Sequence, residues 1–180
     1  MELEKCINGR RSVRSYQDKP VSKEDIAKIL KAGVMAPSSR NRKPWKFIVI
    51  TNKEKIREIS AKVKSALRLL GGKFGERAES EEDVIFYEAP LLILIVAEEE
   101  PKSTLIDCVL AAENMMLEGY NLGLGSCYIG LMNKMEEDSV YLKTLGINEN
   151  QKLYCPLIFG YPTVWPQPKD RKPIIQKRID

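Results

Sequence analysis

Residues 36–47 read Ala-Pro-Ser-Ser-Arg-Asn-Arg-Lys-Pro-Trp-Lys-Phe, and this stretch decides how the rest of the chain is interpreted. It joins a hydroxyl-rich, cationic loop directly to residues 47–50, an apolar run of strand-forming residues. A second cationic run, Arg-Arg-Ser-Val-Arg-Ser-Tyr, occupies residues 10–16. Arginine offers a planar fork of donors that matches a phosphate group. The two segments therefore indicate a site for a flat, polar, anionic ligand.

Hydrophobic periodicity predicts the elements around these segments. Ser22 suits a helix N-cap, the apolar spacing behind it is helical, and Pro37 stops the helix. The continuous apolar run 91–96 predicts a central strand buried on both faces. The helix expected over 103–122 is apolar around most of its circumference, which favours either a core or a subunit interface. We expect further helices over 3–9, 53–70 and 133–145, strands over 45–51 and 152–161, and a charged, mobile surface segment over 73–83.

The composition excludes several classes of function. The chain has 180 residues, of which 43% are hydrophobic and 30% charged, so we expect one domain over residues 1–180. Histidine is absent, which removes the commonest general base and His-ligated metal sites. The four cysteines form no C-x-x-C pair, and the sequence neighbours of Cys127 offer no cation to activate it. We therefore expect no catalytic side chain and no metal site, so that any redox chemistry would need an organic cofactor.

Charge and hydropathy limit the partners. The net charge of +4 is modest and the basic residues alternate with acids, so a nucleic-acid partner is not expected. The longest apolar run, 89–97, is far shorter than the roughly twenty residues of a membrane helix. The N-terminus lacks the apolar region of a secretory signal. We expect a cytoplasmic protein without a membrane partner.

The two cationic segments together resemble the nitroreductase family, which is FMN-dependent. That family carries an arginine–serine–arginine run near the N-terminus and then the element Pro-Ser-Ser-x-Asn-x-x-Pro-Trp-x-Phe, and residues 10–14 and 37–47 match both in order. The resemblance implies an α+β fold of three α-β-α layers, with a central, mainly antiparallel sheet flanked by helices and an extended C-terminal arm. It also implies a homodimer with FMN at the subunit interface.

The resemblance implies a cofactor site built from four parts of the chain. Residues 10–14 correspond to the segment at the FMN phosphate and pyrimidine, and residues 37–41 to a segment brought from the opposite subunit. Residues 129–131 correspond to backbone near the reactive edge of the flavin, and residues 169–171 to a basic tail over the phosphate. The matching residues are Arg10, Arg11, Ser12, Arg14, Pro37, Ser38, Ser39, Asn41, Ile129, Gly130, Leu131, Lys169 and Arg171.

The activity implied by the resemblance is an FMN-dependent oxidoreductase. It would take hydride from NADH or NADPH and reduce a nitroaromatic, quinone or related acceptor by alternating half-reactions. Alternatives are a flavin-binding regulatory protein without turnover, a small basic adaptor for phosphorylated ligands, or a flavin-fragmenting or dehalogenating member of the same family. Arg40, Arg42 and Lys43 stand where smaller or amide residues are common, which predicts an unusually cationic mouth.

Overall fold

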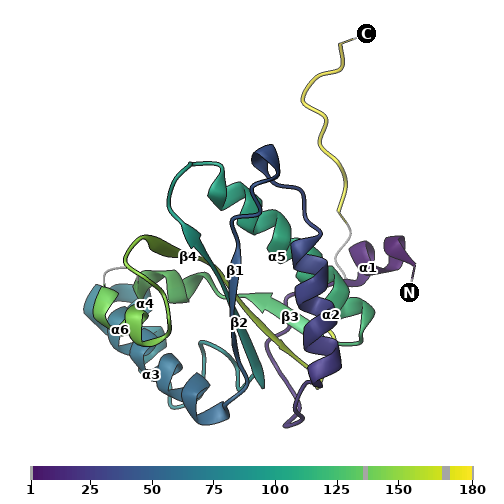
Figure 1. Ribbon diagram of the computed structural model, residues 1–180. Coiled ribbons are helices and arrows are strands. Elements are labelled where there is room, and N and C mark those ends of the chain that lie inside the picture. The colour runs from purple at the N-terminus through teal and green to yellow at the C-terminus, as the bar shows by residue number, and fades with distance from the viewer. Residues whose placement is uncertain (1, 136–137, 168–170, 180) are drawn as a thin grey trace.

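The computed structural model describes residues 2–135, 138–167 and 171–179, and its helices lie on both faces of one sheet (Figure 1). The helices are α1 (Leu3–Gly9), α2 (Lys23–Val34), α3 (Lys53–Leu70), α4 (Gly72–Ala78), α5 (Thr104–Asn121) and α6 (Ser139–Thr144), with short 3-10 turns η1 (Ser39–Asn41) and η2 (Gly130–Met135). The strands are β1 (Lys46–Ile50), β2 (Leu91–Glu98), β3 (Gly125–Tyr128) and β4 (Gln151–Gly160).

The sheet has four strands in the order β1-β2-β4-β3, and every neighbouring pair is antiparallel. The central strand β2 is buried along its length except at Glu98, as its continuous apolar sequence predicts. Beyond β3, Ser12 forms a parallel bridge to Ser126 and so attaches the first cationic segment to the edge of the sheet. The predicted α+β class with an antiparallel sheet is confirmed.

The side chains of β2 alternate between two apolar layers. Residues 92, 94 and 96 pack with α3 and α6 on one face, and residues 91, 93, 95 and 97 pack with α2 and α5 on the other. Each face therefore has its own helical cover, which gives the expected three-layer arrangement.

Helix α5 is buried on one side only. Cys108, Ala112 and Met115 are among the residues that it packs into the layer beneath α2. Gly33 of α2 allows this close approach, because a Cβ there would lie 2.9 Å from the Met115 side chain. The opposite side carries four exposed apolar residues, Leu105, Ile106, Val109 and Leu110. Met115 is thus a core residue of the single chain, and only the other side of α5 is open to a partner.

One predicted helix is wrong, and one segment gains a helix that was not predicted. Residues 73–83 lie mostly at the surface, as expected, and α4 occupies part of them with Ala78 buried; their mobility stays a prediction. The helix expected over 133–145 is divided into η2 and α6, because the Asp138 carboxylate accepts a hydrogen bond from the Tyr141 amide and begins a new helix there. Strand β3 was also not predicted, since its four residues follow a Gly-rich turn.

The C-terminal residues lie outside the three layers. Residues 171–179 form no helix or strand and lead away from the body of the molecule (Figure 1). The expected contact of this arm with a second subunit stays a prediction. Among the described helices, none is both long and apolar enough to cross a membrane.

Candidate active site

The first cationic segment is fixed to β3 by one buried residue. The Val13 amide donates a hydrogen bond to the Ser126 carbonyl over 2.9 Å, and the Val13 carbonyl accepts one from the Tyr16 hydroxyl over 2.8 Å. The Val13 side chain is fully buried against Gly125, where an added Cβ would come within 2.6 Å of it. Because residues in an extended segment alternate, the exposed Ser12 and Arg14 lie on the side opposite Val13.

Arg14 lines a cavity of about 180 Å³ beside the end of β3. The structure thereby brings Arg14 together with residues 129–131, two of the four parts that the sequence assigned to one site. Two residues of the lining, Ile85 and Ile129, are buried apolar residues. The full lining is Arg14, Arg77, Ile85, Tyr87, Cys127, Tyr128, Ile129, Gly130 and Leu131.

Cys127 lies in this lining with cations nearby. Its sequence neighbours offer no cation, but the fold brings Arg14 and Arg10 close enough to lower the pKa of the thiol, and the Ser12 hydroxyl acts in the same direction. Burial is the largest effect and raises the pKa of Cys127 above its usual value. The Cys127 thiol therefore stays protonated near neutral pH and is a poor nucleophile.

The other two arginines of the segment have partners within the chain. The Arg10 guanidinium forms an ion pair with Glu113 of α5, with Nε and Oε1 separated by 3.1 Å. Arg11 donates from Nη1 to the Arg10 carbonyl over 2.6 Å. Neither residue lines the cavity, so Arg14 is the member of this run that faces it.

The second cationic segment forms a closed turn at the N-terminal end of α5. The Ser39 amide donates to Oδ1 of the buried Asp107 over 2.9 Å, and the Lys43 amide donates to the Ser38 hydroxyl over 3.0 Å. Arg42 donates from Nη2 to the hydroxyls of Ser39 at 3.1 Å and Ser103 at 2.8 Å. The segment is therefore held by its own hydroxyls and by Asp107 and Ser103 at the start of α5.

Asn41 is an exposed member of this segment and lies in the left-handed region with φ 56°, as do its neighbours Arg40 and Lys43. Pro37 is also exposed. Among the described residues, no hydrogen bond or ion pair joins residues 37–43 to residues 10–14. The two motifs lie in separate places on one chain.

The tail is the fourth predicted part of the site. Lys169 lies outside the described residues. Arg171 is exposed and makes no hydrogen bond or ion pair with any described residue. Its role at a cofactor phosphate stays a prediction.

Arg77 and Tyr87 line the cavity but were not predicted from the sequence. Both come from the segment between α3 and β2, where Arg77 donates from Nη2 to the Tyr87 hydroxyl over 2.5 Å and to the Val84 carbonyl over 3.0 Å. Tyr87 and Glu88 have φ values of 56° and 55°, a backbone state that costs a non-glycine residue about 1–3 kcal/mol. The only sequence signal is Asp83, a turn-forming residue ahead of an aromatic pair.

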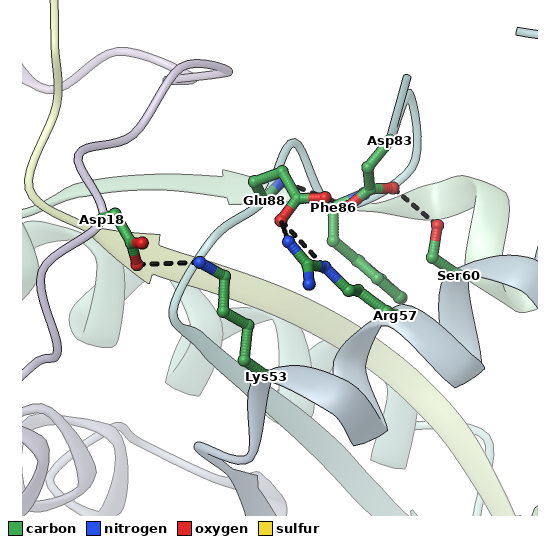
Figure 2. A network of polar contacts seen from close by, with 7 residues as sticks. All are labelled: Asp18, Lys53, Arg57, Ser60, Asp83, Phe86 and Glu88. Carbon is green, nitrogen blue, oxygen red and sulfur yellow. Dashed lines mark hydrogen bonds and ion pairs between the residues drawn. The ribbon is translucent and has the colours of Figure 1, made fainter. Parts of the chain in front are cut away.

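The Asp83 carboxylate holds this turn, as Figure 2 shows. Oδ1 accepts hydrogen bonds from the Ser60 hydroxyl at 2.5 Å and from the amides of Ile85 and Phe86, both at 3.1 Å. Oδ2 accepts the Glu88 amide at 3.1 Å. One carboxylate thus satisfies three backbone donors of a strained turn and ties it to α3.

The comparisons with known proteins place the chain in a family. The nitroreductase family model matches residues 7–161. A protein from Archaeoglobus fulgidus, named as an NADH dehydrogenase/NAD(P)H nitroreductase, is 33% identical over 89% of this chain and 86% of its own length. The chain therefore belongs to the nitroreductase family, which confirms the resemblance seen in its two cationic segments.

Solved structures agree with this assignment. A Bacteroides fragilis nitroreductase with bound FMN superposes with a TM-score of 0.89 at 32% identity, covering 99% of this chain and 98% of that one. A Desulfitobacterium hafniense nitroreductase with bound FMN has a TM-score of 0.82 at 25% identity, with coverage of 96% and 95%. The similarity in both cases spans nearly the whole of each chain.

Proposed function

We propose that this protein is an FMN-dependent oxidoreductase that takes hydride from NADH or NADPH and reduces a nitroaromatic, quinone or related acceptor by alternating half-reactions. The observation that carries the proposal is the convergence of Arg14 and residues 129–131 on one cavity. Family membership supports it, as do the names of the Archaeoglobus relative and of the two FMN-bound structures.

The residues around the cavity fit FMN in their chemistry. Arg14 and Arg77 supply guanidinium donors, and the described lining contains no carboxylate that would repel an anionic cofactor. Ser12 presents an exposed hydroxyl on the same segment as Arg14. Ile85 and Ile129 lie behind this lining as buried apolar residues.

Each part of the site has a distinct task. Arg14 would bind an anionic group of the cofactor, Ser12 would donate to its polar chain, and backbone groups of residues 129–131 would face its ring. When bound, FMN supplies the chemistry of accepting a hydride and passing two electrons to an acceptor. The chain's own contribution is to place the two substrates in turn against the same site, which is catalysis by proximity. No side chain of the cavity is assigned as a proton donor in this proposal, since water can supply the protons.

A homodimer completes the proposed site. The exposed apolar side of α5, formed by Leu105, Ile106, Val109 and Leu110, provides a surface that a second copy would cover. The closed turn at residues 37–43 lies at the N-terminal end of this helix and Arg10 binds to its middle, so both motifs border the same surface. Residues 37–41 of one chain then reach the cavity of the other.

The test is an absorption spectrum of the purified protein, followed by anaerobic titration with NADH and with NADPH. We expect bound FMN, released by heat and identified by chromatography, that is bleached by one of the nucleotides and recovers its colour when a quinone or nitroaromatic is added. Absence of flavin together with no binding of added FMN would contradict the proposal. Flavin that binds but is not reduced by either nucleotide would favour the regulatory alternative.

A further inference from the structure

Glu113 is a carboxylate that lies next to the first cationic segment without lining the cavity. Its Oε1 is 3.1 Å from Nε of Arg10, and this is the hydrogen bond that the Arg10 side chain makes within the described part of the chain. The Arg10 side chain is 21% exposed, so the pair is partly enclosed rather than fully solvated. Because like charges repel, a carboxylate at this place works against a bound phosphate unless it improves the position of Arg10.

The Arg10 backbone is fixed close to α5. The Arg10 amide donates to the carbonyl of the buried Cys6 over 3.0 Å at the end of α1. Helix α1 lies against α5 (Figure 1), and an added Cβ at Gly9 would overlap the Tyr120 hydroxyl. Glu113 and Tyr120 are seven residues apart, which places them on the same side of α5. The end of α1 therefore packs on the side of α5 that carries Glu113.

The ion pair leaves one edge of the Arg10 guanidinium for a ligand. A guanidinium carries five donors in a rigid, planar fork, so a partner at Nε restricts the direction in which Nη1 and Nη2 point. Among the described residues, no acceptor binds Nη1 or Nη2 of Arg10. Burial raises the pKa of the Cys127 thiol and the Arg10 charge acts in the opposite direction, so the guanidinium lies close to this residue of the cavity lining.

The cavity itself is too small to hold a whole cofactor. Its volume of about 180 Å³ lies below the roughly 300–1,000 Å³ of small-molecule sites, so part of FMN would extend beyond it. Arg14 lines the cavity, and Arg10 lies outside it, four residues earlier on the same segment. We infer that Arg10 meets the phosphate of FMN there and that Glu113 is a positioning residue, whose carboxylate holds Nε and leaves Nη1 and Nη2 to the phosphate oxygens. The inference rests on the proposed function and assigns a task in it to a residue outside the cavity.

A double-mutant cycle on FMN affinity tests the role of Glu113. FMN is titrated into the flavin-free parent protein and into Glu113→Ala, Glu113→Gln, Arg10→Ala and the double variant Arg10→Ala/Glu113→Ala, with binding read from flavin fluorescence. Riboflavin, which lacks the phosphate, is titrated into the same set. The control is Glu118→Ala. Glu118 lies on the same helix, accepts a hydrogen bond from Asn121 over 3.2 Å, and forms no ion pair with Arg10.

We expect Glu113→Ala to raise the Kd of FMN by about three- to tenfold, which is within the range of coupling between two groups in direct contact. In the Arg10→Ala background the same change alters the Kd by less than about twofold, because the group that Glu113 positions is gone. The Kd of riboflavin is unchanged in Glu113→Ala. Glu113→Gln keeps an acceptor for Nε and so retains the parent affinity for FMN within about twofold, as does the control Glu118→Ala.

Three results would overturn the inference. Tighter binding of FMN by both Glu113→Ala and Glu113→Gln would show that the carboxylate acts on the phosphate only by repulsion. Equal losses of FMN and riboflavin affinity, or a loss that persists in the Arg10→Ala background, would show that Glu113 only supports the structure of the segment. Unchanged FMN affinity in Glu113→Ala would show that the pair is an ordinary surface ion pair. Failure of the parent protein to bind FMN at all is distinct from these results and contradicts the proposed function itself.

Discussion

The two cationic segments have similar compositions but are held in different ways. Residues 10–14 are fixed to β3 by the buried Val13, so the side chains of Ser12 and Arg14 stay exposed and available to a ligand. Residues 37–43 are fixed by their own polar groups, since Ser38, Ser39 and Arg42 all make hydrogen bonds within the turn or to the start of α5. Arginine content alone therefore does not identify a binding group. A guanidinium whose donors already make hydrogen bonds within the chain has fewer donors left for a ligand.

This difference gives the two segments different expected roles. Arg14 makes one long hydrogen bond to the described part of the chain, 3.5 Å to the Ser12 carbonyl, and lines a cavity. Arg42 is engaged by two hydroxyls and stiffens its turn. We expect the first segment to bind an anion through side chains and the second to contribute a rigid edge with the exposed Asn41.

The largest effect is expected where the first segment meets the sheet. Gly125→Ala places a Cβ within 2.6 Å of Val13, whose buried side chain cannot move without displacing Ser12 and Arg14. Overpacking of this kind costs about 1–3 kcal/mol of unfolding free energy, and we expect FMN affinity to fall as well. Urea unfolding and flavin titration measure both. The matched control is Gly75→Ala in α4, where the nearest atom would be 3.8 Å away and stability is unchanged or slightly higher.

The next largest effect is expected on FMN affinity, and it distinguishes arginines that bind the cofactor from arginines that lie on the surface. Arg14→Ala should weaken FMN binding by about tenfold to hundredfold, because a charge-assisted hydrogen bond contributes about 1.5–3 kcal/mol. Arg171→Ala should act in the same direction if the tail closes over the phosphate. Arg68→Ala, which removes a surface ion pair with Glu79, is the control. Unchanged affinity in both Arg14→Ala and Arg171→Ala would show that these arginines are surface charge.

A smaller effect concerns a thiol that lies away from both segments. Burial raises the pKa of Cys155 to about 12. A thiol whose pKa is higher in the folded state than in the unfolded state stabilises the fold at any pH below the unfolded-state pKa of about 8.5. As the pH rises above about 8.5, this stabilisation is lost by up to about 1.4 kcal/mol per pH unit. Between pH 7 and pH 10 the parent protein should therefore lose about 1–2 kcal/mol more unfolding free energy than Cys155→Ala. Equal losses in urea unfolding would show that Cys155 does not titrate on unfolding in this range.

The smallest effect is expected at Cys127, the thiol beside the first segment. Cys127→Ala should leave nicotinamide-driven reduction of a quinone within a few-fold of the parent rate at saturating FMN, because its raised pKa keeps the thiol neutral. Loss of turnover with flavin still bound would instead require a thiol-dependent mechanism.

Much of the fold follows from periodicity in the sequence. The continuous apolar run of β2 and the capped, amphipathic α2 and α3 were predicted closely, because local spacing fixes their burial. The break between η2 and α6 was missed, since it depends on a single side-chain cap at Asp138. Strand β3 was missed because four residues are too few to show a period.

Only some residues of the candidate site could be predicted from the sequence. Arg14 and residues 129–131 were assigned together through the family resemblance, and the fold brings them to one cavity. Arg77 and Tyr87 could not be found in this way, because their placement depends on the left-handed turn that Asp83 holds. The cation beside Cys127 was missed for a similar reason, since Arg14 is distant in sequence and adjacent only in space.

In the proposed dimer the two cationic segments meet in one site but come from different chains. Mixed dimers of Arg14→Ala and Asn41→Asp chains, purified through two different tags, test this most directly; Asp tolerates the left-handed backbone of Asn41 and adds a repulsive charge. If the segments meet across the interface, each mixed dimer has one doubly altered site and one intact site, and FMN titration shows a fraction with the parent affinity. If both segments serve the site of their own chain, every site carries one alteration. No fraction with the parent affinity would then appear, and the account would be contradicted.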